Sequence, residues 1–333
     1  MGATITIGPD GTATPKNVTI KTGQVVTFVN KDARSDRSRS SIQIRIEFGA
    51  VPLVAKGSDP IFAASDSAGA AYLQFSQVGS DTILQRAFAV SPLRLLAPRT
   101  PGAARWVYLA TYGGGLVGGD SIHMTIDVAR GARALLASQA STKIYRSVTG
   151  ARQHVRGRVG EDALLAILPD PVVCFSGSSF YQQQTYDLTN GASLVLVDWM
   201  TSGRHASGER WAFHRYESRV EVRRNGQRVV YDGLRLSTDE GDIADRMGRF
   251  NVCLVAILVG PLVSPAGLST SDAIAGLPVE KNVDLIVSAA KLGDEGALLK
   301  IAGVCVEQVG AVLRDHLRPL TPLFGDDPWT RKW

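Results

Sequence analysis

The sequence predicts a mainly β protein, built as a large multi-stranded sheet scaffold with one or two helices near the C-terminus. Two observations support this fold class. Short segments rich in Val, Leu, Tyr and Trp recur from residue 72 onwards with turn residues between them, which is typical of strands. A period of three to four residues appears only near the end of the chain. The 333 residues, 44% of them hydrophobic, are sufficient for one large β domain or two ordinary ones.

The N-terminal part differs from the rest. Residues 3–32 alternate in short strands around a Gly-Pro-Asp-Gly turn and resemble the opening strands of a cupredoxin, a small copper-binding β sandwich. The copper ligands of that fold are absent, because the first histidine of the chain is His123, so we expect no blue-copper site. Residues 33–45 are rich in Ser and Arg, which is typical of a linker. We therefore interpret residues 1–68 as an atypical extension and residues 69–333 as the main β domain.

Strands of the main domain are expected at residues 103–110, 122–128, 132–139, 164–168, 192–199, 219–223 and 227–231. In residues 122–128 apolar and polar side chains alternate, which indicates a half-buried strand. Val220 and Val222 should likewise face one side of their strand and the charged residues between them the other. Asn225 and Gly226 then predict a hairpin turn.

Helices are expected only in the C-terminal third. Apolar residues recur at helical spacing over residues 306–317, which predicts one amphipathic helix that ends before Pro319. A second, weaker helical pattern covers residues 271–275.

A glycine-rich run, GGGLVGGD at residues 113–120, ends in the carboxylate of Asp120. A phosphate-binding loop would have to open a helix, whereas this run is followed by the strand pattern of residues 122–128 and has no Lys-Ser or Lys-Thr. We therefore interpret it as a turn that joins two strands.

Charge, cysteines and hydropathy limit the class of protein. The net charge of +5 is small for this length and favours an acidic protein surface over nucleic acid as partner. Three cysteines, Cys174, Cys253 and Cys305, lie in apolar runs, where buried thiols pack well, and fit a reduced, cytoplasmic setting. We expect no signal peptide and no membrane span, because the longest apolar run covers only about residues 252–259.

Signatures of common hydrolases are missing from the sequence. It contains no Gly-x-Ser-x-Gly elbow, and its five histidines form no His-x-x-x-His pair. Three carboxylates, Asp120, Asp198 and Glu209, remain as candidates for acid-base chemistry. Two interpretations of Asp198 stay open: a structural pair with a cation such as Arg204, or a role in metal passage or partner contact.

Two further blocks carry polar residues. In STKIYRS, residues 141–147, Lys143 and Tyr145 should share one strand face and Arg146 the other. In GRHASGE, residues 203–209, the glycines bracket a bend that would bring Arg204 and Glu209 together, so that the carboxylate holds the guanidinium or coordinates an ion transiently.

These blocks, together with residues 164–180 and the C-terminal LRPL and PWTRKW, occur in the order seen in the urease accessory protein UreD (UreH) family, which the chain resembles from about residue 72 to 333. The chain departs from the family pattern at Ala166 and Ile167, where Glu-Trp is usual, and at Pro169 and Asp170, where Pro-Gln is usual.

The resemblance implies a protein that is not an enzyme. It implies a scaffold that binds apo-urease and UreF, which recruits the GTPase UreG, so that nickel reaches the urease active site. It implies no tightly bound cofactor, only transient nickel in an internal polar channel. Candidate channel or partner-contact residues are Asp120, Thr142, Lys143, Tyr145, Arg146, Asp198, Arg204 and Glu209. His205 is chemically suited to nickel, but the family pattern does not require a His there, so we assign no metal ligand. The alternatives are a β-rich interaction module and a hydrolase that uses Asp120 and Glu209.

Overall fold

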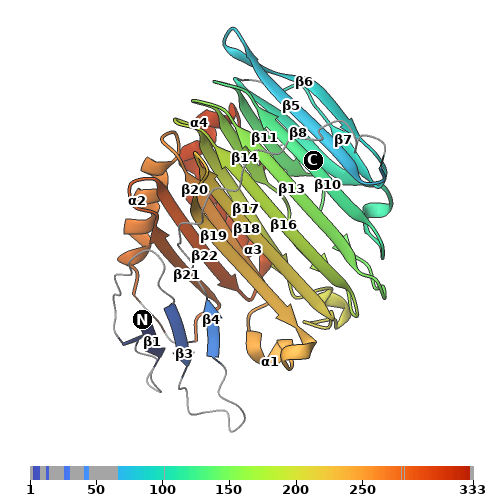
Figure 1. Cartoon of the computed structure of the whole chain (residues 1–333). Helices are drawn as coiled ribbons and strands as arrows, with labels where there is room; N and C mark the ends of the chain where they lie inside the picture. The colour runs from blue at the N-terminus through green and yellow to red at the C-terminus, as the bar shows by residue number, and fades with distance from the viewer. Residues whose placement is uncertain are drawn as a thin grey trace.

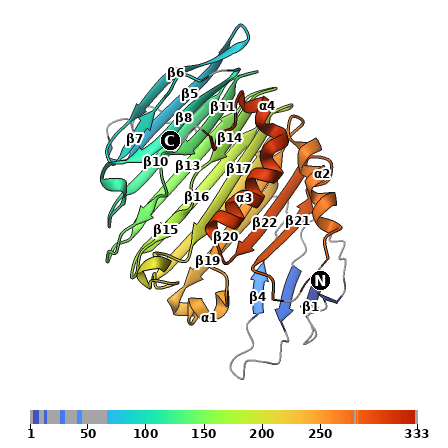
Figure 2. The same cartoon turned by 180° about the vertical axis from the view of Figure 1, so that it is seen from behind.

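The computed structural model describes residues 67–330 except 101, 279 and 281, together with the backbone of four short strands in the N-terminal part. Strands account for 49% and helices for 17%, so the expected mainly β class is confirmed. Two large sheets lie face to face, and helices cover the outer side of one of them (Figures 1 and 2). No helix among the described residues combines the length and the apolar character that a membrane crossing requires.

The N-terminal strands form a separate four-stranded sheet in the order β2-β1-β3-β4. Their bounds are Ala3–Ile7 (β1), Ala13–Thr14 (β2), Val26–Asn30 (β3) and Ser41–Ile44 (β4). Most of the expected linker, residues 33–40, lies outside the described residues. Its end is a strand, β4, contrary to our expectation. The division of the chain at residue 68 stays a prediction.

The first large sheet has seven strands in the order β19-β18-β16-β13-β10-β5-β6. Their bounds are Ala70–Val78 (β5), Asp81–Ala89 (β6), Ser121–Val128 (β10), Ala151–Val159 (β13), Ser179–Leu188 (β16), Arg215–Arg224 (β18) and Gln227–Ser237 (β19). Strand β10 alternates buried and exposed side chains as predicted. The predicted hairpin joins β18 to β19, with positive φ at both Asn225 and Gly226, as its turn type requires.

The second sheet has eleven strands. Eight form the path β21-β22-β20-β17-β14-β11-β8-β7: Leu93–Leu96 (β7), Ala104–Thr111 (β8), Arg133–Ser138 (β11), Leu164–Leu168 (β14), Ser193–Thr201 (β17), Val252–Val259 (β20), Leu285–Lys291 (β21) and Gly296–Gly303 (β22). Three short strands lie off this path: Gly115–Leu116 (β9), Lys143–Ile144 (β12) and Val172–Cys174 (β15).

Through the middle of the molecule the chain alternates between the two sheets. It runs from β10 to β11, from β13 to β14 and from β16 to β17, and each strand lies parallel to its neighbour of the preceding turn. Ser121 pairs with Arg152, and Ala151 pairs with Phe180, so one turn of this coil takes roughly thirty residues. Antiparallel strands flank the coil on both sides. All parallel strands of the first sheet therefore begin at the same end of the molecule.

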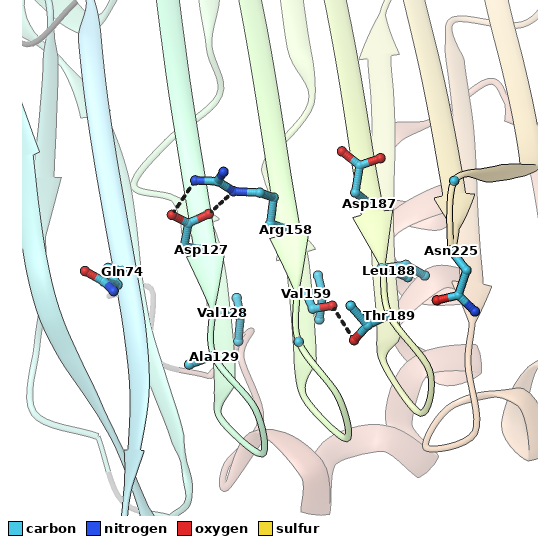
Figure 3. Close-up of a pocket in the computed structure, with 12 residues that line it drawn as sticks. Gln74, Asp127, Val128, Ala129, Arg158, Val159, Asp187, Leu188, Thr189 and Asn225 are labelled. Atoms are coloured by element: carbon cyan, nitrogen blue, oxygen red, sulfur yellow. Dashed lines mark hydrogen bonds and ion pairs between the residues drawn. The ribbon is translucent and has the colours of Figure 1, made fainter. Parts of the chain in front are cut away.

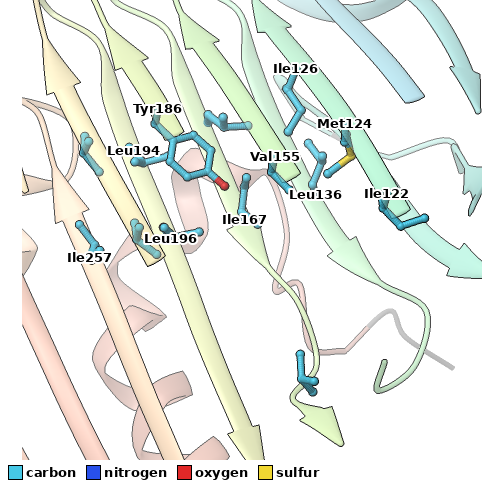
Figure 4. Packing of buried hydrophobic residues seen from close by; sticks show 14 of the residues in the cluster. Ile122, Met124, Ile126, Leu136, Val155, Ile167, Tyr186, Leu194, Leu196 and Ile257 are labelled. Carbon is cyan, nitrogen blue, oxygen red and sulfur yellow. The ribbon is translucent and has the colours of Figure 1, made fainter. Parts of the chain in front are cut away.

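The main core fills the space between the two sheets. Figure 4 shows side chains that meet there: Ile122, Met124, Ile126, Val155 and Tyr186 from the first sheet, and Leu136, Ile167, Leu194, Leu196 and Ile257 from the second. Each fully buried side chain of this size contributes about 1.5–3 kcal/mol to the free energy of folding. This packing fixes the backbone positions of the residues that alternate with it on the outer face of the first sheet.

The helices are Ile243–Met247 (α1), Ser264–Ala275 (α2), Val306–Leu317 (α3) and Thr321–Phe324 (α4), with short 3-10 helices at Tyr112–Gly114, His205–Ser207, Thr238–Glu240 and Arg318–Leu320. A second core lies between the second sheet and the helices α2, α3 and α4, whereas α1 packs against the main core (Figure 2). The bounds of α3 agree with the prediction, whereas α2 begins earlier than residue 271. Trp106 on β8 is buried and donates a hydrogen bond to the Phe324 carbonyl, 2.9 Å away, which ties the C-terminal helices to the sheet.

All three cysteines are free. Burial raises the pKa of the Cys174 and Cys253 thiols to about 12, so both remain protonated, as expected for packed thiols. Cys305 differs from the prediction. It is exposed just before α3, and its thiol donates to the Glu307 carboxylate over 2.8 Å.

Candidate functional site

Four of the five sequence blocks converge at the end of the molecule where the parallel strands of the first sheet begin. The short strand β12 pairs with β9 on one side and with β15 on the other, so segments far apart in the sequence lie side by side. We call the surface formed by residues 112–120, 142–149, 174–178 and 203–209 the block end. The fifth block lies elsewhere, because LRPL follows α3 in the helical layer.

The glycine run meets the STKIYRS block through a close backbone approach. A Cβ at Gly115 would overlap the Lys143 carbonyl and the Tyr145 ring, so only glycine permits this contact. The Tyr145 hydroxyl donates to the Gly113 carbonyl over 3.1 Å. Lys143 and Tyr145 thus both lie against the glycine run, as the predicted shared face requires, while Ile144 between them is buried.

An aromatic ring links the remaining segments. The Phe175 ring meets the Tyr145 ring edge to face with 5.2 Å between centroids. The Arg204 guanidinium lies over the Phe175 ring, 4.4 Å from its centroid. Both are favourable arrangements, because the ring edge is electropositive and the ring face electronegative. Sequence reasoning did not single out Phe175, although it lies in one of the family-like blocks.

Arg204 and Glu209 form an ion pair across the bend, as predicted. The Arg204 Nε donates to Glu209 Oε2 over 3.0 Å, a second guanidinium nitrogen contacts the other carboxylate oxygen, and the Ser176 amide donates to Oε2 over 3.1 Å. The hydrogen bond from Arg204, together with the Ser176 amide, holds the pKa of Glu209 below its usual value. Glu209 raises the pKa of Arg204 in turn. His205 lies in the exposed 3-10 turn between them.

Asp120 closes the glycine-rich turn. Its Oδ2 accepts a hydrogen bond from the Val117 amide over 2.8 Å, while its own amide donates to the Val117 carbonyl over 3.1 Å. Thr142 and Arg146, the two remaining candidates of the STKIYRS block, lie in different surroundings. The Thr142 carbonyl accepts from the Val173 amide over 2.9 Å, and Arg146 is exposed beside Gly177.

Asp198 does not pair with Arg204, contrary to one of our two interpretations. It points from β17 into the space between the sheets and accepts hydrogen bonds from Gln182 Nε2, over 3.0 Å, and from the Ser218 hydroxyl. Loss of hydration raises its pKa despite these bonds. Neutral donors rather than a cation therefore satisfy this carboxylate.

Further polar side chains lie near Asp198 between the sheets. They are Gln182 and Gln184 on β16, Ser218 on β18, Asp232 on β19 and Lys300 on β22, with Lys300 bound to Asp232 over 2.5 Å. The Tyr186 hydroxyl donates to Gln184 over 2.7 Å. We call Asp198 together with these side chains the inner polar cluster. In the described part of the chain, no three or more His, Cys, Asp or Glu side chains converge into a group that could hold a metal ion.

One surface hollow lies away from all of these residues. It measures about 390 Å³ and sits at the opposite ends of the strands, on the outer face of the first sheet (Figure 3). Arg158 binds Asp127 there through two hydrogen bonds of 2.6 and 2.8 Å, and the Tyr72 hydroxyl donates to the same carboxylate over 2.7 Å. None of the predicted site residues lines this hollow.

Separated sequence blocks of this two-sheet scaffold thus meet in one exposed surface, an arrangement typical of proteins that bind other proteins. The chain belongs to the UreD family. Residues 67–333 match the family described as UreD urease accessory protein.

Curated relatives agree over most of their length. The chain is 46% identical over 268 residues to the urease accessory protein UreD of Sorangium cellulosum (strain So ce56), covering 80% of this chain and 85% of that one. It is 41% identical over 266 residues to the UreD of Anaeromyxobacter sp. (strain Fw109-5), covering 79% and 89%, and 34% identical over 296 residues to the urease accessory protein D of Oryza sativa subsp. japonica, covering 80% and 96%. The resemblance read from the sequence blocks is thereby confirmed, and the family supports a role in urease maturation.

Proposed function

We propose that this protein is a non-enzymatic scaffold that binds apo-urease and the UreF-UreG accessory proteins and assists nickel delivery into the urease active site. The observation that carries the proposal is the exposed apolar surface at the block end. Tyr112 and Val117 are more than half exposed there (59% and 53%), and Val148 is fully exposed. Large apolar side chains gathered on one surface are typical of protein-protein contacts.

The apolar residues belong to loops that touch each other. A Cβ at Gly118 would overlap Ser147 and come within 2.9 Å of the Thr149 hydroxyl, so the loop of Val117 packs against the loop of Val148. Lys143 and Arg146 are exposed in the same block, which favours a partner surface with acidic groups. An apolar centre with charged groups beside it has the anatomy of an interface.

The inner polar cluster supports the second half of the proposal. An ion in transit needs oxygen and amide groups that replace its hydration shell without holding it tightly. Asp198, Gln182 and Ser218 offer such groups between the sheets, and their contacts are with neutral partners. Nickel is the cargo of this route rather than a resident cofactor. Asp198 is the candidate residue for its passage.

The hydrolase alternative gains no support from the two carboxylates on which it depends. Asp120 accepts the Val117 amide within its own turn, and Glu209 is bound by Arg204 and the Ser176 amide. A carboxylate with a lowered pKa is also a poor general acid at neutral pH. An interaction module without a role in nickel transfer differs from our proposal only in its effect on urease activation.

The test compares two double variants. Val117→Ser with Val148→Ser alters the block end, and Val78→Ser with Ile83→Ser makes the same kind of change at exposed positions on β5 and β6. In cells that express the urease subunits and the other accessory proteins, we expect the first pair to lower co-purification of UreF and apo-urease and the nickel content of urease. The second pair should behave like wild type. Normal co-purification with the first pair would contradict the docking role, and normal nickel content despite lost binding would favour the simple interaction module.

A further inference from the structure

Two histidines that are distant in the sequence lie side by side on the outer face of the first sheet. His123 on β10 and His154 on β13 are direct register partners on parallel strands. Their rings stack with 5.0 Å between centroids and 9° between planes. Because Ile122, Met124 and Val155 beside them are buried in the core, the two backbone positions are fixed.

The pair opens into a hollow of about 380 Å³ in the middle of this face. His123 is exposed and His154 half-buried, so both rings can be reached from solvent and can turn about their side-chain bonds. The hollow lies on the opposite face of the sheet from the inner polar cluster, and none of its lining residues belongs to the block end.

Oxygen donors surround the two imidazoles. Gln183 on β16 is the register partner of His154 on its other side, and its Oε1 accepts a hydrogen bond from Tyr181 over 3.1 Å. Ser121 Oγ lies 2.9 Å from His123 Nε2. Two imidazole nitrogens and an amide oxygen in one row provide the N and O donors that late transition-metal ions accept.

We propose that His123 and His154 form a binding site for a divalent late transition-metal ion, with Gln183 and water completing the coordination. The side chains need only a rotation that turns the two ring nitrogens towards a common point above the sheet. This site requires no partner protein and does not depend on the function proposed above.

The charge around the pair sets the strength of the site. Arg152 lies next to His154 on the outer face, and its positive charge repels a cation. Arg156 in the hollow is partly neutralised by Asp187, 3.6 Å away. We therefore expect a site weaker than a closed four-ligand site, with copper bound more tightly than nickel.

The test uses the purified full chain without a histidine tag and without partners. Calorimetric titration with NiCl2 and with CuCl2 should give one saturable site, and the Cu²⁺ spin resonance spectrum should show coupling to two imidazole nitrogens. His123→Ala and His154→Ala should each weaken the affinity at least roughly tenfold and leave coupling to one nitrogen. His214→Ala, at an exposed histidine bound to Thr238, is the matched control and should leave the metal affinity and the coupling to two nitrogens unchanged.

Two results would overturn the site: no saturable binding to the wild-type chain, or equal affinity in wild type and in both single variants. Circular dichroism of the variants establishes that the fold is retained. A loss of metal binding with normal urease activation would separate this site from the nickel-delivery proposal, because the latter depends on the block end and the inner polar cluster.

Discussion

The Tyr145 ring meets the Phe175 ring edge to face, and this contact joins two sequence blocks that belong to successive turns of the coil. Arg204 from the next turn lies over the same Phe175 ring. The block end is therefore held by side chains as well as by short strands.

Replacing Phe175 should damage the block end specifically. Phe175→Leu keeps an apolar side chain but removes the edge-to-face and cation-π contacts, so we expect a loss of about 1–2 kcal/mol in the free energy of unfolding, measured by urea titration. Partner co-purification should fall as well. Phe88→Leu removes a ring that stacks on Tyr72 at 6.1 Å and should leave partner binding intact. Equal partner binding in the two variants would contradict the role of Phe175.

The Arg204 and Glu209 pair should make stability depend on pH in the acid range. Because the folded-state pKa of Glu209 lies below its usual value of 4.5, its contribution is complete above 4.5 and is lost as the pH falls through the lower folded-state pKa. Wild type should therefore exceed Glu209→Gln in stability at neutral pH, and the difference should vanish in acid. Thermal unfolding at a series of pH values measures it. In an Arg204→Gln background the same substitution should have a smaller effect, and an unchanged effect would show that the pair is not the cause.

Asp198→Asn should separate stability from nickel transfer. The raised pKa of Asp198 means that ionisation opposes folding, so this cost is absent at low pH and grows as the pH rises through the folded-state pKa. The variant should accordingly match or exceed wild type in stability at neutral pH, while the nickel content of urease should fall. Asp127→Asn, at a carboxylate on the outer face, is the control for nickel transfer. Normal nickel content of urease with Asp198→Asn would contradict a role of this residue in nickel passage.

The N-terminal extension should be dispensable for urease activation. The family match begins at residue 67, after the four-stranded N-terminal sheet. Removal of residues 1–66 should leave partner co-purification and urease activity close to those of the full chain. Complete loss of activity in a deletion protein that still folds would show that the extension is an integral part.

Local patterns predicted many strands but not how they pair. The alternation in β10 indicates a half-buried strand whether its neighbours run parallel or antiparallel, so the coil was not visible in the sequence. Strands β13 and β16 were missed for a different reason. Gln182 and Gln184 face inward, and Arg152 and Arg156 face outward, so these segments lack a simple apolar period.

The candidate site shows the same division between local and distant contacts. Arg204 and Glu209 were predicted to meet because two glycines bracket them within seven residues, and they do. The partners of Asp198 come from β16 and β18 in the opposite sheet, and no spacing in the sequence relates them to it. The pair of His123 and His154 depends in the same way on the parallel register.

The alternating path of the chain has a consequence for how such a protein can change. Every turn of the coil returns to the end of the molecule where the parallel strands of the first sheet begin. Extra residues inserted in the loops at that end would enlarge the surface offered to partners and leave the strand register unchanged. One residue added inside β13 would instead turn its outward side chains inward and break its match to both neighbours. The connecting loops can therefore vary without loss of the fold, whereas insertions within the strands of the two sheets disrupt it.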